Sequence, residues 1–403
     1  MKVTFISTVP ASGLARAALQ LKKEFGLSLE LKVYYPRQID EEQVKDDVVF
    51  QDLRSSDAVF VDIRGSGRSI DLVYRALKDE RNIVINLMAP VGKMMEITRL
   101  GSFRGKSLAG KIRDDEARDP EEVWKKISRA ESLVQTAGRL VPLGPVRDAG
   151  NYVRFARYWR YGGEKNYRNL LMLLLKDYLN CDLPRPSEPE PFPEFGIYHP
   201  RYGYFQELKD YTCASGHDSS RPTIGIIFYG NMHFEQCQPV LKALIEEFEG
   251  YNKIPVFSDG IHNLRAMRRF FFDEGDPVLD ALINLTWFRL NGGPLGGDPS
   301  LTRQLLRDLN VPVFTPACMY SRKIDEWKMS DTGLSPIESI MAVIWPELDG
   351  SVEPIPCCGV RDVSVGELEA HEVAAIEERV RKIASRIKSW IRLKHKDNSE
   401  KRV

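Results

Sequence analysis

Three side chains able to bind a metal ion or transfer a proton alternate along one short segment, at His233, Glu235 and Cys237. They follow an apolar run that predicts a strand, so we expect them in the loop or helix after it. The zinc deaminases combine H-x-E with C-x-x-C, whereas this chain has only the adjacent Cys357 and Cys358. Two adjacent cysteines do not readily bind one tetrahedral ion, and a deaminase site is therefore excluded.

Two further histidines, His199 and His262, lie in expected loops. A histidine alone in a loop is more often a surface or hydrogen-bonded structural residue than a catalytic one. Neither position therefore predicts a site without further evidence.

The second candidate site is a glycine-rich segment, which reads Asn-Leu-Thr-Trp-Phe-Arg-Leu-Asn-Gly-Gly-Pro-Leu-Gly-Gly-Asp over Asn284–Asp298. The apolar run Leu279–Leu285 predicts a buried strand that leads into it, and a helix capped by Asp298 or Ser300 is expected after it. Strand-to-helix loops of α/β sheets lie at the carboxyl edge, where ligands bind. A tight connection with no ligand explains the glycines equally well.

Phosphate-binding motifs are incomplete in this sequence. Gly101–Ser107 is close to a Walker A loop but has three residues between its glycines where the motif needs four. Gly65-Ser66-Gly67 is a lone G-x-G, which favours a purely structural turn. We therefore expect no ATP site.

Composition sets the class of protein. The 403 residues are 43% hydrophobic and 28% charged, and 57 basic residues balance 57 acidic ones, so two or three globular domains and no nucleic-acid groove are expected. Six scattered cysteines suit reduced thiols, which predicts a cytoplasmic protein. The first residues contain no apolar stretch of signal-peptide length, and Leu170–Leu175 is too short to span a bilayer.

Alternating strand and helix patterns predict an α/β fold with two Rossmann-like doubly wound domains. An aromatic stripe at Tyr152, Phe155 and Trp159 marks an intervening helical segment and is more typical of core than of a cofactor platform. Pro184–Pro193 holds five prolines, which indicates a stiff linker. The expected organisation is an α/β domain over 1–120, helices over 121–182, the linker over 183–200, a second α/β domain over 201–365 and a C-terminal linking helix over 366–403.

The last of these segments is expected to be helical from Glu367 to Lys396. Apolar residues recur at helical spacing and would form one face in need of a partner, namely Val373, Ile376, Val380, Ile383, Ile387 and Ile391. We expect the rest of the second domain to cover this face only in part.

Several phrases carry a family resemblance when they are taken in order. They are Tyr158-Trp159 with Gly162-Gly163-Glu164 and Leu170-Leu171; Tyr198-His199-Pro200; Arg221–Tyr229 with His233; Asn284–Asp298; Trp327 with Gly333-Leu334 and Pro336; Pro346–Gly350 with Glu353-Pro354-Ile355; and Ser385–Val403. Together they resemble the amino-terminal portion of the large subunit of tetrapyrrole metal chelatases, the CobN-type cobaltochelatase and magnesium chelatase H family. The resemblance covers about residues 150–403.

The chain departs from the family pattern in two places and in length. Ser335 stands where many members have histidine, and Cys357–Val360 replaces a family G-R or G-G tail. Family members are about three times as long, so the resemblance predicts that this chain is a fragment, a split gene or a truncated frame. It is then expected to be inactive without the downstream domains.

The resemblance implies a ligase that forms nitrogen–metal bonds in cobalamin or chlorophyll-type biosynthesis. A divalent ion, cobalt or magnesium, would enter the tetrapyrrole while a base removes two pyrrole protons, and separate AAA+ subunits would bind and hydrolyse the ATP. It implies His199, His233 and Glu235 as base or metal ligand. Tetrapyrrole contacts would come from Thr286, Phe288, Gly292, Gly293, Gly296 and Gly297. No nucleic-acid or membrane partner is expected.

A different class remains open on the residues alone. Two α/β domains joined by a linker also describe a bilobal small-molecule-binding module or a glycosyltransferase-like protein. Binding of a sugar nucleotide would favour the glycosyltransferase, and binding of a tetrapyrrole would favour the chelatase.

Overall fold

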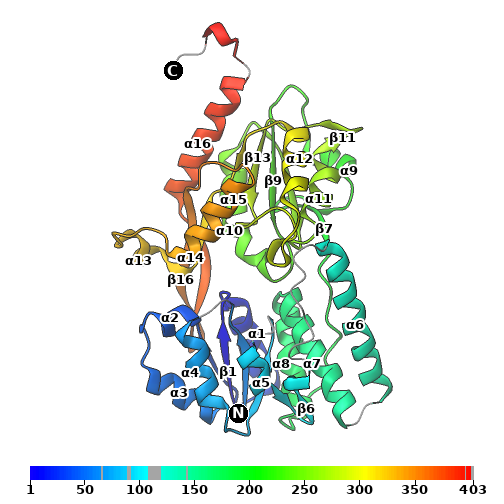
Figure 1. Ribbon diagram of the computed structural model, residues 1–403, viewed down its shortest axis with the longest axis vertical. Coiled ribbons are helices and arrows are strands. Elements are labelled where there is room, and N and C mark those ends of the chain that lie inside the picture. The colour runs from blue at the N-terminus through cyan, green and yellow to red at the C-terminus, as the bar shows by residue number, and fades with distance from the viewer. Residues whose placement is uncertain (65–66, 89–91, 108–118, 142–143, 395, 401–403) are drawn as a thin grey trace. The chain divides into compact units, whose positions relative to one another are not determined.

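The protein, described here from a computed structural model, divides into two compact units (Figure 1). The structure describes all residues except 65–66, 89–91, 108–118, 142–143, 395 and 401–403. Unit 1 consists of Met1–Asp115, Lys125–Pro191 and Asp362–Glu372, and unit 2 of Glu116–Trp124, Phe192–Arg361 and Val373–Val403. Each unit holds one six-stranded sheet, so the predicted α/β class with two sheet domains is confirmed.

The sheet of unit 1 has the order β2-β1-β3-β4-β5-β6. Its first four strands are parallel, and two short antiparallel strands extend one edge. The strands are β1 (Lys2–Ser7), β2 (Glu30–Tyr34), β3 (Ala58–Asp62), β4 (Ile83–Asn86), β5 (Arg99–Leu100) and β6 (Phe103–Arg104). Apolar runs buried on both faces make the central strands recognisable from sequence, as parallel sheets require.

Helices cover both faces of this sheet. On one face α2–α5 bury an aliphatic cluster that includes Val49, Val61 and Val73. On the other, Phe155 and Trp159 pack against Phe60 and Phe5, which confirms the core interpretation of the aromatic stripe. The helices that lie wholly in unit 1 are α1 (Ser12–Phe25), α2 (Pro36–Asp40), α3 (Asp46–Ser55), α4 (Arg68–Leu77), α5 (Gly92–Ile97), α7 (Gly144–Tyr161) and α8 (Glu164–Asp177). The first residues of α6 (Pro120–Leu140) belong to unit 2, and the rest of that helix belongs to unit 1.

Two sequence motifs of unit 1 carry no ligand-binding geometry that the structure describes. The Gly65–Ser69 turn includes residues 65 and 66, which lie outside the described residues. Gly101–Ser107 forms the short β5–β6 turn and one 3-10 turn. A Walker A loop instead joins a strand to a long helix, which this segment does not do.

The sheet of unit 2 has the order β14-β13-β9-β10-β7-β8. Its four parallel strands are β14 (Val313–Phe314), β13 (Ala281–Leu285), β9 (Thr223–Tyr229) and β10 (Asn252–Ser258), and β7 (Phe195–His199) and β8 (Gly203–Phe205) continue it antiparallel. The expected linker thus ends in a strand. Its proline-rich part is neither helix nor strand.

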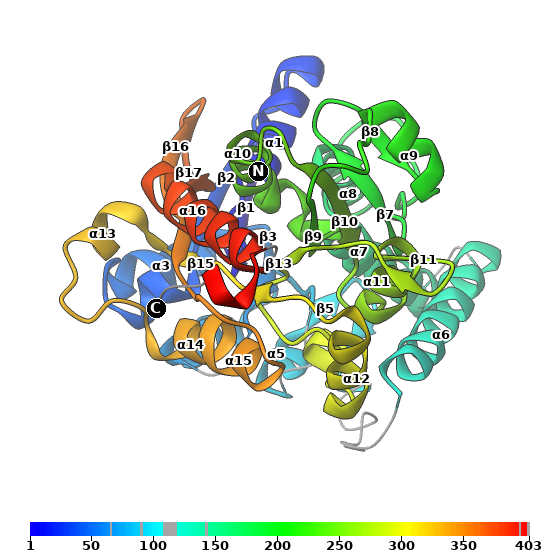
Figure 2. The same cartoon turned by 90° about the horizontal axis from the view of Figure 1, so that it is seen from above.

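Alternate residues of β9 face the two layers that sandwich this sheet. Ile224, Ile226 and Phe228 pack in the cluster formed with α10 (Phe234–Glu247) and α16 (Glu377–Lys394). Ile227 belongs instead to the cluster of α11 (Asn263–Phe270) and α12 (Pro299–Leu309). Figure 2 shows these two helix pairs on opposite sides of β9 and β13. Because helices cover both faces of the sheet, the ends of its strands are the places left for a ligand.

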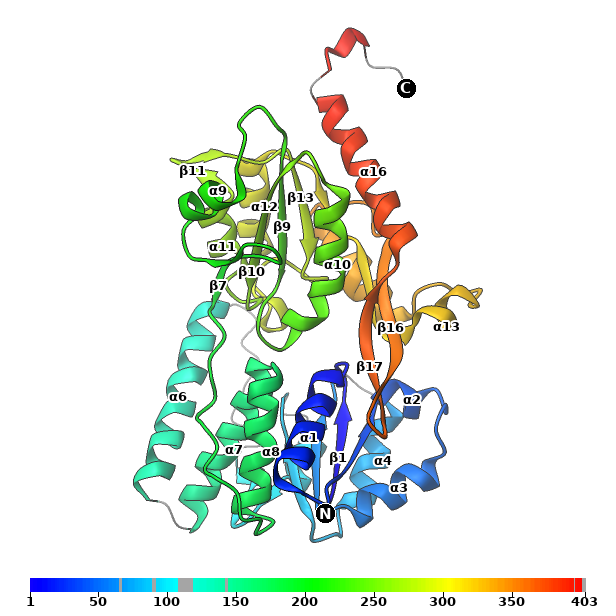
Figure 3. The same ribbon diagram turned by 180° about the vertical axis from the view of Figure 1, so that it is seen from behind.

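The C-terminal region differs from the expected single helix. Residues 356–375 form a hairpin of β16 (Pro356–Val365) and β17 (Leu368–Ala375), which joins β15 (Ala317–Lys323), and α16 begins only at Glu377 (Figure 3). Gly366 makes the turn with a φ of +65°. Val373 therefore lies on strand β17 and not on the expected helix.

The apolar face of this region is covered more fully than we expected. Its six residues have exposed fractions between 0% and 5%, and most of them pack in one cluster with Val240, Leu244 and Phe248 of unit 2. The prediction of a partly unpartnered face is therefore wrong. The physical reason is that α10 lies along α16 and presents its own apolar stripe to it.

The remaining elements of unit 2 are short, and they are α9 (Leu208–Ser215), α13 (Ile324–Lys328), α14 (Pro336–Ser339), a π-helical turn (Ile340–Ile344), α15 (Trp345–Leu348) and the hairpin β11 (Phe272–Asp273) to β12 (Asp276–Pro277). In the described ranges, no helix combines the length and the apolar character needed to cross a membrane.

Candidate functional site

The candidate site lies at the carboxyl edge of the sheet in unit 2. In the parallel register, β9, β10 and β13 end side by side at Tyr229, Ser258 and Leu285. The loops that follow them contain His233, His262 and the glycine-rich segment. The edge is thus the topological position where α/β proteins bind ligands.

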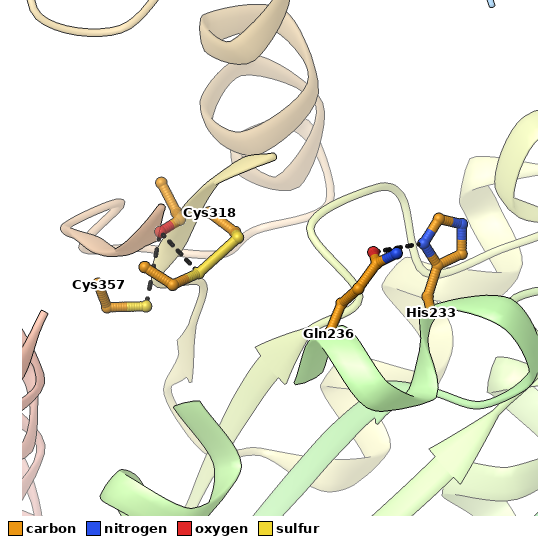
Figure 4. Close-up of a disulfide and its surroundings, with 6 residues drawn as sticks. His233, Gln236, Cys318 and Cys357 are labelled. Carbon is orange, nitrogen blue, oxygen red and sulfur yellow. Dashed lines mark hydrogen bonds between the residues drawn. A yellow bond between two sulfur atoms is a disulfide. The ribbon is translucent and has the colours of Figure 1, made fainter. Parts of the chain in front are cut away.

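His233 lies at the start of α10, held by a contact with its own helix. Its Nδ1 is 2.9 Å from Oε1 of Gln236 (Figure 4). An amide oxygen only accepts, so Nδ1 carries the proton and the lone pair of the neutral ring is on Nε2. The ring centroid is 5.2 Å from that of Tyr229 and 6.2 Å from that of Tyr320. This orientation suits Nε2 to accept a proton or to bind a metal ion.

Glu235 and Cys237 lie on the first turns of α10 after His233. Glu235 is exposed. Cys237 is fully buried in the core, and burial raises its pKa to about 12, so the thiolate needed for metal binding is disfavoured. Of these two residues, the Glu235 carboxylate is therefore the better candidate for a group that accepts a proton.

The glycine-rich loop is held in shape by close backbone contacts. Gly292, Gly293 and Gly296 have φ angles of +73°, +48° and +69°. A Cβ on Gly292 would lie 2.2 Å from the carbonyl oxygen of Gly296, and one on Gly297 would meet the side chain of Asn291 at 2.6 Å. At Gly296 a Cβ would meet nothing within 4 Å. Local geometry therefore requires most of these glycines, whereas Gly296 faces open space.

Two other predicted contact residues serve the loop itself. The hydroxyl of Thr286 donates to Asn284 Oδ1 at 2.7 Å and is fully buried. Phe288 packs edge-on against Trp345, with ring centroids 4.5 Å apart. The helix after the loop begins as predicted, because the Asp298 carboxylate accepts from Ser300 N at 2.8 Å and Pro299 is its first residue.

A carboxylate from a distant motif fixes the start of the same loop. Asp349 is 3% exposed, and its carboxylate accepts from Leu290 N at 3.0 Å and from Arg289 Nη2 at 3.2 Å. The Pro346–Gly350 phrase thus contacts the Asn284–Asp298 phrase, although about 60 residues separate the bonded atoms along the chain. Two of the phrases that carry the family resemblance are one structural unit.

His262 is the residue of this edge that sequence reasoning passed over. It is 1% exposed, and its Nδ1 lies 2.8 Å from Asp259 Oδ2. Burial alone would lower the pKa of the imidazole, but the hydrogen bond to Asp259 and the charges of Asp259, Glu194 and Glu121 outweigh it and raise that pKa. The signal in the sequence was the D-x-x-H spacing directly after a strand, which places both groups at the carboxyl edge.

Buried polar atoms at this edge remain available to a bound molecule. Among the described residues, Ser258 Oγ, both amide atoms of Asn263 and Trp287 Nε1 have no hydrogen-bond partner, and each residue is at most 1% exposed. An unpaired buried polar group costs about 1–3 kcal/mol, so each one calls for an explanation, such as a bound molecule that pairs with it. Their position beside the glycine loop and His262 supports a ligand site here.

His199 lies apart from this site. Because β7 runs antiparallel to β10, Phe195 at the start of β7 pairs with Ser258, and the strand leads away from the carboxyl edge to His199. His199 therefore lies at the amino edge of the sheet, opposite His233. The structure brings His233, Glu235 and the glycine loop to one edge and places His199 at the other.

Cysteines near α10 are paired differently from the expectation. Cys318 and Cys358 form a disulfide, since the β15–β16 register places them opposite each other with their Cα atoms 4.8 Å apart (Figure 4). The expectation of six reduced thiols is wrong at this pair. Cys357 beside it is a buried thiol whose pKa burial raises. Within the described ranges, no three His, Cys, Asp or Glu side chains form a metal-binding group.

Comparison with known proteins places these features in context. The CobN/Magnesium Chelatase family model matches residues 156–403. The magnesium-chelatase subunit ChlH of Oryza sativa is 28% identical over 292 residues, 67% of this chain and 20% of that protein. The aerobic cobaltochelatase subunit CobN of Pseudomonas aeruginosa is 27% identical over 258 residues, 62% of this chain and 20% of that protein.

A solved structure with a similar fold is the catalytic subunit of cobaltochelatase from Mycobacterium tuberculosis. It matches with a TM-score of 0.50 and 17% identity, and the match covers all of this chain and 28% of that one. The chain thus spans about a fifth of the length of the curated relatives it matches.

Proposed function

Because this chain belongs to the CobN/magnesium chelatase family, we propose that it is an amino-terminal part of the tetrapyrrole-binding large subunit of an ATP-dependent metal chelatase. The observation that carries the proposal is the carboxyl edge of unit 2, where a shaped glycine loop, an oriented imidazole and unpaired buried polar atoms meet. Cobalt or magnesium is then the substrate ion, in cobalamin or chlorophyll-type biosynthesis. AAA+ partner subunits supply ATP hydrolysis, and the rest of the large subunit completes the site.

In this proposal the protein provides binding and proton acceptance. The backbone at Gly296 lies against the macrocycle edge, since Gly296 faces open space and has no side chain to hold a flat ring away. Metal insertion requires two pyrrole N–H protons to leave, and Nε2 of His233, with Glu235 two residues further on, accepts them.

Tetrapyrrole binding tests the loop. Gly296→Val is expected to weaken binding of a free-base porphyrin, measured by quenching of intrinsic fluorescence, by about tenfold or more, or 1.4 kcal/mol. The matched control is Gly26→Val, because Gly26 has a φ of +63° and also meets nothing within 4 Å, but ends α1 in unit 1. Both variants carry the same kind of backbone strain. Equal affinities in the two variants would show that the loop is only a connection.

Metal insertion tests the base. His233→Ala is expected to lower the rate of insertion by about a hundredfold, the usual contribution of a positioned base, while porphyrin affinity changes little. The assay follows the metal-dependent absorbance change with the downstream polypeptide, the ATPase partners and ATP present. His217→Ala is the control, since His217 is an exposed histidine of the same unit. An unchanged rate in His233→Ala would remove this residue from the mechanism.

A further inference from the structure

The amino edge of the unit 2 sheet holds a cavity of about 510 Å³, at the end of the sheet opposite the proposed tetrapyrrole site. His199 lines it from the end of β7, and Asn252 and Lys253 line it from the start of β10. Tyr202 and Tyr211 form part of its wall. Nothing in the proposed chelatase chemistry uses this cavity.

His199 presents a hydrogen-bond donor to the cavity. Its Nδ1 accepts a hydrogen bond from the backbone N–H of Arg201 at 3.1 Å, so in the neutral ring the proton is on Nε2. Burial, and then the charges of Lys253 and Arg201, lower the pKa of His199 to about 4, so the ring is neutral near pH 7. The residue is 6% exposed, and no acceptor within the described part of the chain pairs with Nε2–H. A donor that faces the cavity without an acceptor from the protein can donate to a bound molecule in place of water.

The ring is also fixed in place, which favours one direction for that donor. Its centroid lies 4.6 Å from that of Tyr202 and 6.2 Å from that of Tyr211. Tyr211 is itself anchored, because its hydroxyl donates to the carbonyl oxygen of Lys253 at 2.6 Å. The donor is therefore pre-organised, and little side-chain entropy is lost when an acceptor binds.

Cationic side chains outnumber acidic ones around the cavity. Its lining includes four cations, Arg201, Arg221, Lys242 and Lys253, and two carboxylates, Glu246 and Glu249. Arg221 pairs with Asp218 at 3.1 Å. In the described ranges, the other three cations have no carboxylate within 4.0 Å, and the Lys253 ammonium donates to the Phe248 carbonyl oxygen at 3.3 Å with two further protons to offer. The excess of positive charge favours an anion.

We propose that this cavity binds a small molecule through an oxoanion group, a phosphate or a carboxylate, which accepts from Nε2–H of His199 and from the Lys253 ammonium. Both groups have oxygen acceptors that suit a neutral N–H and an ammonium at once. His199 thus acts as a ligand-binding donor at a second site, and the carboxyl edge keeps its own chemistry.

Calorimetric titration of the full chain at pH 7 and constant ionic strength tests this site with two probes, inorganic phosphate and acetate. Saturable binding of one or both is expected, and the tighter probe identifies the group as phosphate or carboxylate. Lys253→Met keeps most of the aliphatic stem and is expected to weaken binding about tenfold, as is His199→Phe, which keeps an aromatic ring beside Tyr202. His217→Gln, outside the cavity lining, is expected to bind as the unaltered chain does.

A second readout follows the His199 ring directly. The Nε2–H proton resonance in the NMR spectrum is expected to shift on titration with the bound probe and to be missing from the spectrum of His199→Phe. If His199→Phe does not fold, Lys253→Met carries the test. The proposal is overturned if neither probe binds saturably to the unaltered chain, or if Lys253→Met binds as tightly as that chain does.

Discussion

Asp349→Ala is expected to lower the free energy of unfolding by about 2–4 kcal/mol, because it leaves the buried Leu290 N–H without its acceptor and the half-buried Arg289 guanidinium without its charge partner. The Asp349 carboxylate is almost fully buried, and it holds both the Arg289 guanidinium and the Leu290 N–H. Its loss also frees the start of the glycine loop. Chemical denaturation measures the stability, and porphyrin quenching measures the accompanying loss of affinity.

The control for this variant lies two residues before Asp349, on α15. Glu347→Ala removes an exposed carboxylate of α15 and is expected to change stability by less than about 0.5 kcal/mol. Asp349→Asn keeps the shape and one acceptor oxygen, so it is expected to fall between the two. If Asp349→Ala were as stable as Glu347→Ala, the contact between the two family phrases would have no structural importance.

Ile383→Ala is expected to destabilise the protein by about 3 kcal/mol, the usual cost of removing a large aliphatic side chain from a core. Ile383 is fully buried in the cluster that α16 forms with α10. Denaturant midpoints at an unchanged slope would measure the loss. A loss of this size indicates that α16 packs against α10 in this chain, whereas a helix whose apolar face is covered only by another polypeptide would show a much smaller loss.

Leu393→Ala provides the comparison within α16. Leu393 is 44% exposed, so its removal is expected to cost less than about 1 kcal/mol. A small effect at both positions would contradict the packing of this helix against α10. A loss at Ile383 alone would support it.

The strands of both sheets were predictable because each central strand is a short apolar run between turn residues, as Thr223–Tyr229 and Leu279–Leu285 show. The loop and helix cap at Asp298 were predictable for a similar reason, since Pro299 and Ser300 have local preferences. Strand β17 could not be predicted in the same way, because Val373 and the following Ile376 also fit one face of a helix. Only the turn at Gly366 and the pairing with β16 make this segment a strand.

The grouping of site residues was less predictable than the elements. His199 lies at the amino edge because β7 runs antiparallel to β10. The sequence of β7, a short strand at the end of a proline-rich segment, does not predict that direction. The contact of Asp349 with Leu290 depends on tertiary packing that no local pattern encodes. The pairing of His262 with Asp259 could be predicted from their spacing in the sequence. Only the burial of His262 and the 2.8 Å contact distinguish this pair from one on the surface.

The path of the chain between the units limits how they can be taken apart. The proline-rich segment is the evident place for a single proteolytic cut, yet Glu116–Trp124 of unit 2 precede it and Asp362–Glu372 of unit 1 follow it. Within unit 1, the His371 ring of that late segment stacks on Tyr35 at 3.8 Å between centroids, and His371 N donates to the Tyr35 hydroxyl at 2.8 Å. A nick at the prolines would leave each piece without a segment of its own unit, so the two halves should stay associated after cleavage rather than separate as independent domains.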